Sequence, residues 1–132
     1  MSELRGPLVL YVEDEPLILE LGLGAMEEAG FEVESFSAAE PALAAISAHG
    51  GDVRALVTDI DLGSRLTGWD IAKTARGLHP EMPIIYVSGG SANDWPSLGV
   101  PGSIMLVKPY AAAQLVVAIS NALIKADGDP AT

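Results

Sequence analysis

The segment Arg54-Ala55-Leu56-Val57-Thr58-Asp59 joins a run of aliphatic, β-favouring residues to a carboxylate. A short run of this kind is typical of a strand that is buried in a sheet. Because the run stops at Asp59, the predicted strand delivers an acidic group to one edge of that sheet.

Reactive side chains also follow the other aliphatic runs of the chain. They are an acid pair, a hydroxyl group and an ammonium group: Glu13-Asp14 after residues 8–12, Ser88 after residues 83–87, and Lys108 after residues 104–107. In open α/β sheets, ligands bind at the edge that is formed by the carboxyl ends of the strands. We therefore expect these side chains to gather with Asp59 at one site.

Predicted strands and helices alternate along the chain, which indicates an α/β protein with a mostly parallel sheet. The strand at residues 31–36 alternates in polarity, as an edge strand with one solvated face would. Four glycines and two prolines lie between Gly89 and Gly102, so we expect a short or mobile fourth helix, with one or two turns around residues 93–98. We expect a single domain over residues 1–132, with its core at about residues 7–126 and frayed termini.

The composition narrows the possible functions. The chain has 132 residues, 49% of them hydrophobic, which is enough for one domain with its own core. Since there is no cysteine, disulfides and thiolate metal sites are excluded. The net charge of -11 argues against nucleic acid and anionic membranes as partners. No run is long enough to span a membrane and no signal peptide is recognisable, so we expect a cytoplasmic protein.

The predicted site brings together the carboxylates of Glu13, Asp14 and Asp59, which would repel one another. A hard divalent cation relieves such repulsion, and Mg²⁺ prefers oxygen ligands. A carboxylate can also attack phosphorus and form an aspartyl phosphate. The pattern therefore predicts Asp59, on the central strand, as the nucleophile, with Glu13 and Asp14 holding the metal. Lys108 and Ser88 would stabilise the anionic group that is transferred.

These motifs together resemble the receiver domain of two-component response regulators. The resemblance covers about residues 7–125 and rests on five pieces of sequence: Val12-Glu13-Asp14-Glu15-Pro16, Val57-Thr58-Asp59-Ile60-Asp61-Leu62, Gly68, Val87-Ser88-Gly89 and Lys108-Pro109. It implies a flavodoxin-like, doubly wound sheet of five parallel strands in the order 2-1-3-4-5, flanked by helices.

The resemblance also implies a magnesium site. Its expected ligands are the side chains of Asp14 and Asp59 and the backbone carbonyl group of Asp61. Glu13 would act on the metal through a water molecule.

A phosphorylation reaction follows from the same resemblance. Asp59 would accept a phosphoryl group from the phosphohistidine of a sensor histidine kinase. Lys108 would pair with this group, and Ser88 would form a hydrogen bond with it in the active state.

Three features depart from the family's usual pattern. Glu13 stands where aspartate is commoner, and the loop after Asp59 is one residue longer and has Gly63 in place of the usual proline. Met105 occupies the position of the aromatic residue that usually moves together with the serine or threonine. With the short fourth helix, these features resemble stand-alone alphaproteobacterial receivers that are paired with HWE-type histidine kinases.

We therefore expect a single-domain response regulator that signals by protein–protein docking or serves as a phosphate sink or shuttle. Its own aspartyl phosphorylation and dephosphorylation would be its only catalysis. The expected partners are a sensor histidine kinase and a histidine phosphotransfer or other response protein. We expect a monomer that binds neither nucleic acid nor membranes.

Other functions stay open at this point. Asp59-Ile60-Asp61 matches the Asp-x-Asp motif of haloacid-dehalogenase-like phosphatases, although in that family the nucleophile precedes the acid pair along the chain. A pseudo-receiver would bind partners without phosphorylation, but such proteins usually lose an acid or the lysine, and here all are present. A flavodoxin-like cofactor binder is disfavoured because the acidic loop at residues 13–15 would repel a cofactor phosphate.

Overall fold

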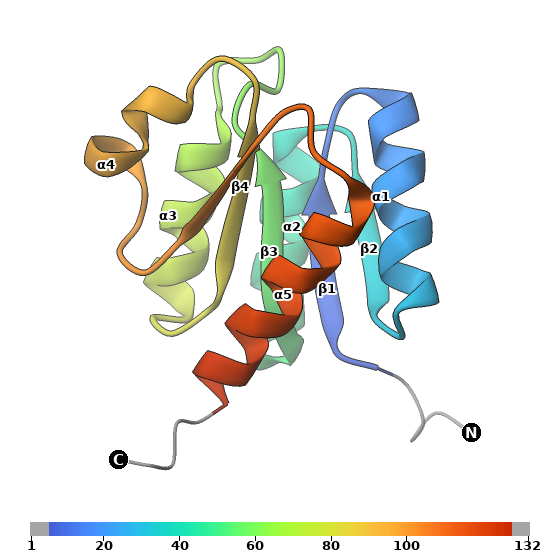
Figure 1. The fold of residues 1–132 in the computed structure, drawn as a ribbon. Coiled ribbons are helices and arrows are strands. Elements are labelled where there is room, and N and C mark those ends of the chain that lie inside the picture. Colours follow the sequence, from blue (N-terminus) through green and yellow to red (C-terminus); the bar gives the residue numbers. More distant parts are fainter. Residues whose placement is uncertain (1–5, 128–132) are drawn as a thin grey trace.

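The computed structural model has one parallel sheet whose strands run in the order β2-β1-β3-β4-β5 (Figure 1). The structure describes residues 6–127. The strands are β1 (Leu8–Val12), β2 (Glu32–Phe36), β3 (Val53–Asp59), β4 (Ile84–Ser88) and β5 (Ile104–Val107). The flavodoxin-like, doubly wound α/β fold predicted from the sequence is confirmed, including the strand order.

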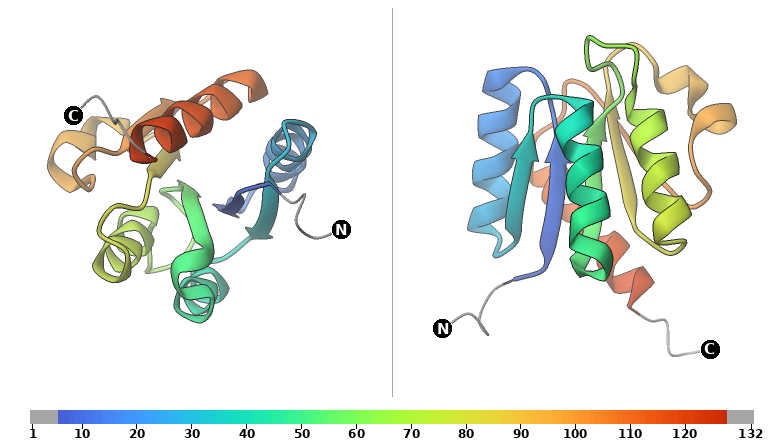
Figure 2. Two further views of the ribbon diagram at one scale, coloured as in Figure 1. Left: turned by 90° about the horizontal axis from the view of Figure 1, so that it is seen from below. Right: turned by 180° about the vertical axis from the view of Figure 1, so that it is seen from behind.

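Helices cover both faces of the sheet, as the view along the strands in Figure 2 shows. They are α1 (Pro16–Glu28), α2 (Ala39–His49), α3 (Gly68–Leu78), α4 (Trp95–Leu98) and α5 (Ala112–Ala126), with short 3-10 turns η2 (Gly50–Asp52) and η3 (Ala92–Asp94). Helices α1 and α5 lie on one face, and α2 and α3 lie on the other. None of the helices in the described part of the chain is long and apolar enough to cross a membrane.

Each face of the sheet has its own hydrophobic core, because successive residues of a strand point to opposite faces. Val9 and Tyr11 of β1 pack with residues of α1 and α5, whereas Leu10 and Val12 pack with residues of α2 and α3. All four side chains are fully buried. This explains why the central strands are continuous apolar runs in the sequence.

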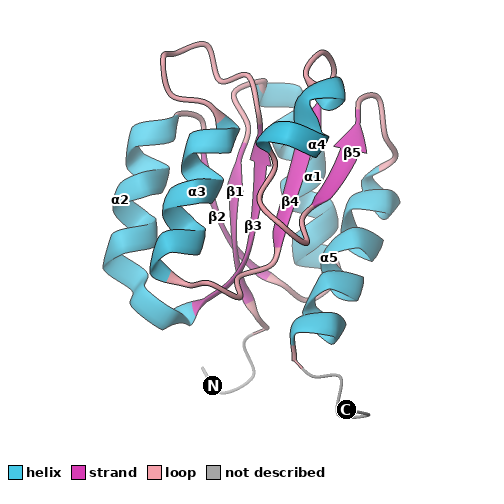
Figure 3. Cartoon of the chain, turned by 90° about the vertical axis from the view of Figure 1, so that its left-hand side faces the viewer, coloured by secondary structure: helices cyan, strands magenta, loops and turns pink. Residues whose placement is uncertain are grey.

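The two edge strands differ from the central ones. All five residues of β2 are half-buried rather than alternately buried and solvated, because α1 packs against one of its faces and α2 against the other. At the opposite edge, α4 lies beside β5 and has only four residues (Figure 3). The predictions of a short fourth helix and of an edge strand at residues 31–36 are therefore confirmed, whereas the solvated face expected for that strand is wrong, because both of its faces are half-buried.

Candidate functional site

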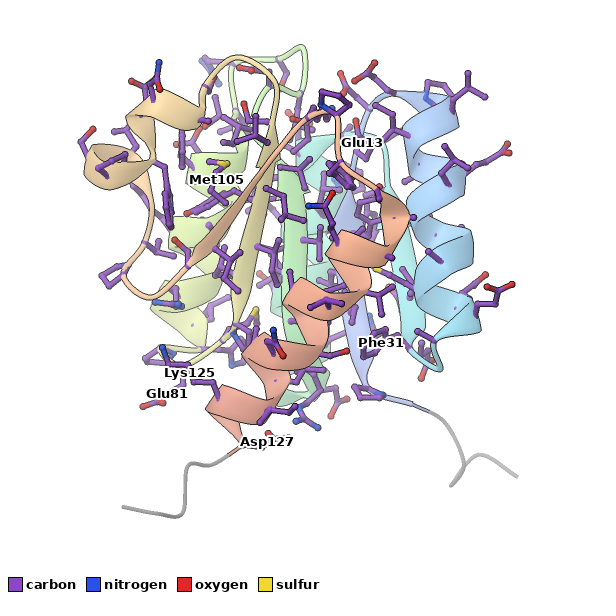
Figure 4. All side chains as sticks on the ribbon, viewed as in Figure 1. Glu13, Phe31, Glu81, Met105, Lys125 and Asp127 are labelled. Carbon is purple, nitrogen blue, oxygen red and sulfur yellow. The ribbon has the colours of Figure 1, made fainter. Side chains whose placement is uncertain are left out.

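The carboxyl ends of β1 and β3 bring three acidic side chains together. Glu13 follows β1 and is fully buried, while Asp59 ends β3 and is 4% exposed. Asp14 is more open to solvent, and oxygen atoms of the three carboxylates lie within 4.8 Å of one another. Figure 4 shows Glu13 at the end of the sheet that is opposite Lys125 and Asp127. The structure thus places the predicted acids at one site.

Lys108 completes this cluster from the end of β5. Its Nζ lies 3.0 Å from Asp59 Oδ2 and 3.4 Å from Glu13 Oε2. It also lies 2.9 Å from Oε1 of Glu15, a contact that the sequence did not predict. Burial alone would lower the pKa of Lys108, but the hydrogen bonds to Glu15 and Asp59 and the attraction of the acids raise it above its usual value. The ammonium group is therefore positively charged at neutral pH.

Glu13 is held in an unfavourable environment for a negative charge. Its Oε2 accepts hydrogen bonds from Lys108 Nζ and from the backbone N–H of Glu15 at 3.2 Å. Its buried Oε1 has no hydrogen-bond partner among the described residues. Burial and the nearby charge of Asp59 raise the pKa of Glu13 to about 7.

A divalent cation fits this group of atoms. Burial and the charge of Asp59 also raise the pKa of Asp14, so both residues beside Asp59 are destabilised as anions. Carboxylate oxygens are the ligands that Mg²⁺ prefers, and a cation would stabilise all three anions at once. The unpartnered oxygen of Glu13 supports this fit because a buried polar atom normally has a partner.

Ser88 lies at the end of β4, next to the strand that carries Asp59. The residue is fully buried, and its Oγ accepts a hydrogen bond from the backbone N–H of Ser91 at 2.8 Å. Its backbone carbonyl accepts a hydrogen bond from the backbone N–H of Lys108, also at 2.8 Å. The side chain of Ser88 thus lies at the predicted edge of the sheet, and its Oγ accepts a hydrogen bond from the following loop.

Asp61 lies in the loop after β3 and is exposed. Its Oδ2 accepts a hydrogen bond from the hydroxyl group of Ser91 at 3.1 Å. The predicted role of its backbone carbonyl as a metal ligand stays a prediction. Ser91 was not among the residues that the sequence singled out, although it contacts two that were.

The start of α3 fixes the end of this loop. Thr67 Oγ1 accepts a hydrogen bond from the backbone N–H of Asp70, and the Asp70 carboxylate accepts one from the backbone N–H of Thr67. Gly68 then donates its N–H to the carbonyl of Ile60 at 2.9 Å. A Cβ atom on Gly68 would lie 2.2 Å from the backbone oxygen of Asp59. Only glycine therefore allows α3 to approach the backbone of Asp59 so closely.

Comparisons with known proteins agree with this geometry. The family model of the response regulator receiver domain matches residues 9–120. The nitrogen assimilation regulatory protein NtrX of Azorhizobium caulinodans is 32% identical over 118 residues, which cover 87% of this chain and 26% of NtrX. The sensor kinase CckA of Brucella abortus is 30% identical over 122 residues, which cover 90% of this chain and 13% of CckA. The chain thus spans only a small part of the length of these two relatives.

A solved structure is similar along nearly its whole length. The crystal structure of a response regulator receiver protein from Sinorhizobium medicae superposes with a TM-score of 0.88 at 36% sequence identity. The match covers 93% of this chain and 98% of that one. The strand order, the acidic cluster and these matches agree, and the chain belongs to the family of response regulator receiver domains.

Proposed function

We propose that Asp59 accepts a phosphoryl group from the phosphohistidine of a sensor histidine kinase, in a reaction that depends on Mg²⁺. The observation that carries this proposal is the position of Asp59 beside both Lys108 and the carboxylates of Glu13 and Asp14. An isolated buried carboxylate would repel an incoming phosphoryl group, because both are negatively charged. Here a fixed ammonium group lies 3.0 Å from the oxygen of Asp59, and a candidate cation site adjoins it.

In this reaction, an oxygen of Asp59 forms a bond with phosphorus while the bond between phosphorus and the imidazole nitrogen breaks. The electron pair of that bond returns to the histidine ring. Lys108 stabilises the negative charge of the phosphoryl oxygens because its ammonium group is held in place before transfer begins. Ser88 supplies a hydroxyl donor from the neighbouring strand.

The proposed ligands of Mg²⁺ are the carboxylates of Asp14 and Asp59 and the backbone carbonyl of Asp61, with Glu13 acting through a water molecule. When bound, the cation would neutralise charge on the phosphoryl oxygens. The raised pKa of Glu13 and its unpartnered oxygen support a cation at this position. A nearby positive charge would lower this pKa and would give the buried oxygen a partner.

The proposal extends to the protein's partners. The phosphoryl donor would be a sensor histidine kinase of the HWE type. Gly63 and Met105, which depart from the usual receiver sequence, support this pairing. The phosphorylated chain would act in the cytoplasm as a monomer, by docking to a histidine phosphotransfer or other response protein or as a phosphate sink. It would catalyse only its own phosphorylation and dephosphorylation. The net charge of -11 supports protein partners over nucleic acid.

Incubation with Mg²⁺ and acetyl phosphate, followed by intact mass spectrometry, tests the reaction. The wild-type chain should gain about 80 Da, the mass of one phosphoryl group. Neither Asp59→Asn nor wild type treated with EDTA should show the adduct. Asp61→Asn keeps its backbone carbonyl and serves as the matched control, which should still be modified. An equal yield in Asp59→Asn would refute the assignment, and no adduct in wild type would favour the pseudo-receiver alternative.

A further inference from the structure

A hollow of about 600 Å³ lies between the end of α3, the starts of β4 and β5, and the last turns of α5. Two of its lining residues, Glu81 and Lys125, are at the end of the molecule opposite Glu13 in Figure 4. The crossover between two parallel strands usually carries a helix that covers the sheet. Here α4 has only four residues and contributes none of the lining, so the surface between α3 and α5 is open at this end.

Two of the chain's seven cationic residues line this hollow. The half-buried side chain of Arg76 is held in place, because its Nε donates to the carbonyl of Met82 at 2.7 Å. The two terminal nitrogens of Arg76 and the ammonium group of Lys125 have no hydrogen-bond or ion-pair partner in the described part of the chain. Asp127, two residues after Lys125, is paired with Arg54 instead. Although the net charge is -11, this hollow therefore holds two cations without acidic partners.

The rest of the lining suits an organic molecule better than a bare ion. Pro83, Ile104 and Ala122 are half-buried and line the hollow with apolar atoms. The exposed amide group of Asn121 can donate or accept a hydrogen bond. The volume of the hollow falls within the range of about 300–1,000 Å³ that is usual for small-molecule sites. Guanidinium and ammonium groups, in turn, bind the oxygens of phosphate and carboxylate groups.

We propose that this hollow binds a small organic anion, whose phosphate or carboxylate group is attracted by Arg76 and Lys125 and whose apolar part packs against Pro83 and Ile104. The site does not depend on the proposed phosphorylation of Asp59. It lies at the opposite end of the sheet from the acidic cluster, which would repel an anion. Phenyl phosphate is the probe for this site, because it joins one phosphate group to one small apolar ring.

Titration with phenyl phosphate in the absence of Mg²⁺, followed by NMR, tests the site. The backbone amide signals of residues 102–104 and 121–125 should shift and reach saturation. Inorganic phosphate lacks the ring and phenol lacks the phosphate group, so each should bind at least about threefold more weakly than phenyl phosphate. Equal binding of either control compound, or no shift of these signals at about 10 mM phenyl phosphate, would overturn the proposal.

Single substitutions test the role of each charge. Lys125→Gln and Arg76→Gln should each weaken the binding of phenyl phosphate by about twofold to fivefold, as expected for the loss of one partly exposed charge pair. Glu81→Gln should strengthen it, because this substitution removes a negative charge from the lining. Lys73→Gln is the matched control, because Lys73 is an exposed cation of α3 that does not line the hollow. Its affinity should equal that of wild type.

The outcome does not depend on Arg76→Gln, which also loses the hydrogen bond to Met82 and could unfold the protein. Lys125 and Glu81 are exposed, so substitutions at these two positions should leave the fold intact. Opposite effects of Lys125→Gln and Glu81→Gln would place the anion in the hollow. Unchanged binding in Lys125→Gln, or an equal loss of affinity in Lys73→Gln, would overturn the proposal.

Discussion

The hydroxyl group of Tyr86 accepts a hydrogen bond from the backbone N–H of Val100, with 3.1 Å between the two atoms. Both residues are buried, and the ring of Tyr86 packs against Trp69 with 4.7 Å between ring centroids. Tyr86 precedes Ser88 by two residues in β4. The same strand that ends at the site therefore also anchors the far end of the segment that contains α4.

Replacing Tyr86 by phenylalanine should lower the free energy of unfolding by about 1–2 kcal/mol, because the buried N–H of Val100 loses its partner. Urea unfolding measures this change. Tyr11→Phe is the control, since the Tyr11 hydroxyl group donates to the carbonyl of Ile18 within α1, and its loss should have a smaller effect. Equal effects of the two substitutions would show that the Val100 contact is not the cause.

Gly68→Ala should lower the free energy of unfolding by about 1–3 kcal/mol, because the new methyl group overlaps the backbone of Asp59. It should also reduce the yield of the aspartyl phosphate. Gly77→Ala lies in the same helix, where a Cβ atom meets nothing within 4 Å, and should be neutral or stabilising. Urea unfolding and intact mass spectrometry test both effects, and a stable, fully phosphorylated Gly68→Ala would contradict them.

The raised pKa of Glu13 predicts how stability changes with pH. The pKa is 4.5 in the unfolded reference and about 7 in the folded protein, so the folded state binds more protons between these values. Its stability should therefore fall as the pH rises from about 4.5 to 7 without Mg²⁺. Glu13→Gln should flatten this part of the profile.

Mg²⁺ should reverse this trend, because it favours the deprotonated carboxylates. Thermal unfolding at pH 6 and pH 8, with and without Mg²⁺, should show the larger stabilisation at pH 8. A stabilisation by Mg²⁺ that is larger at pH 6 would contradict the assignment of the cation to Glu13, Asp14 and Asp59.

Lys108→Met should destabilise the metal-free protein by about 2–4 kcal/mol, because it leaves the buried acids Glu13 and Asp59 without their cation. Part of this loss should be recovered in Mg²⁺. Lys125→Met, on the exposed end of α5, should change stability by less than about 0.5 kcal/mol. Urea unfolding of both variants tests the contrast, and similar losses would argue against the ion pairs of Lys108 as the cause.

The sequence predicts the acidic cluster well because its members sit at strand ends. Aliphatic runs define where β1, β3 and β5 stop, and parallel pairing brings those ends to one edge. Asp59 and Lys108 are 49 residues apart, and yet their contact follows from this rule. Met105, which stands in the position of the usual aromatic residue, is on β5 in Figure 4 and packs against the hydrophobic core.

The contacts of Glu15 and Ser91 could not be predicted in this way. Both residues lie in loops, where side-chain direction depends on local turns rather than on a repeating pattern. The Lys108–Glu15 pair joins residues 93 positions apart, and neither the spacing nor the residue types distinguish Glu15 from its acidic neighbours. Likewise, the prediction that β2 has a solvated face was wrong. The alternation of polar and apolar residues along a strand does not show how far neighbouring helices such as α1 and α2 extend over it.

Ser88 contacts both ends of the segment that follows it. Its Oγ accepts a hydrogen bond from the N–H of Ser91, and its backbone carbonyl accepts one from the N–H of Lys108. This segment contains α4 and the paired strand β5, and its irregular part around α4 lies between the Ser91 bond and the hydrogen bond from Val100 to Tyr86. The entropy of closing a flexible loop grows slowly, by about 0.6 kcal/mol for each doubling of its length. Insertions and deletions around α4 should therefore be tolerated as homologues diverge, without displacing the strand ends that carry Asp59 and Lys108.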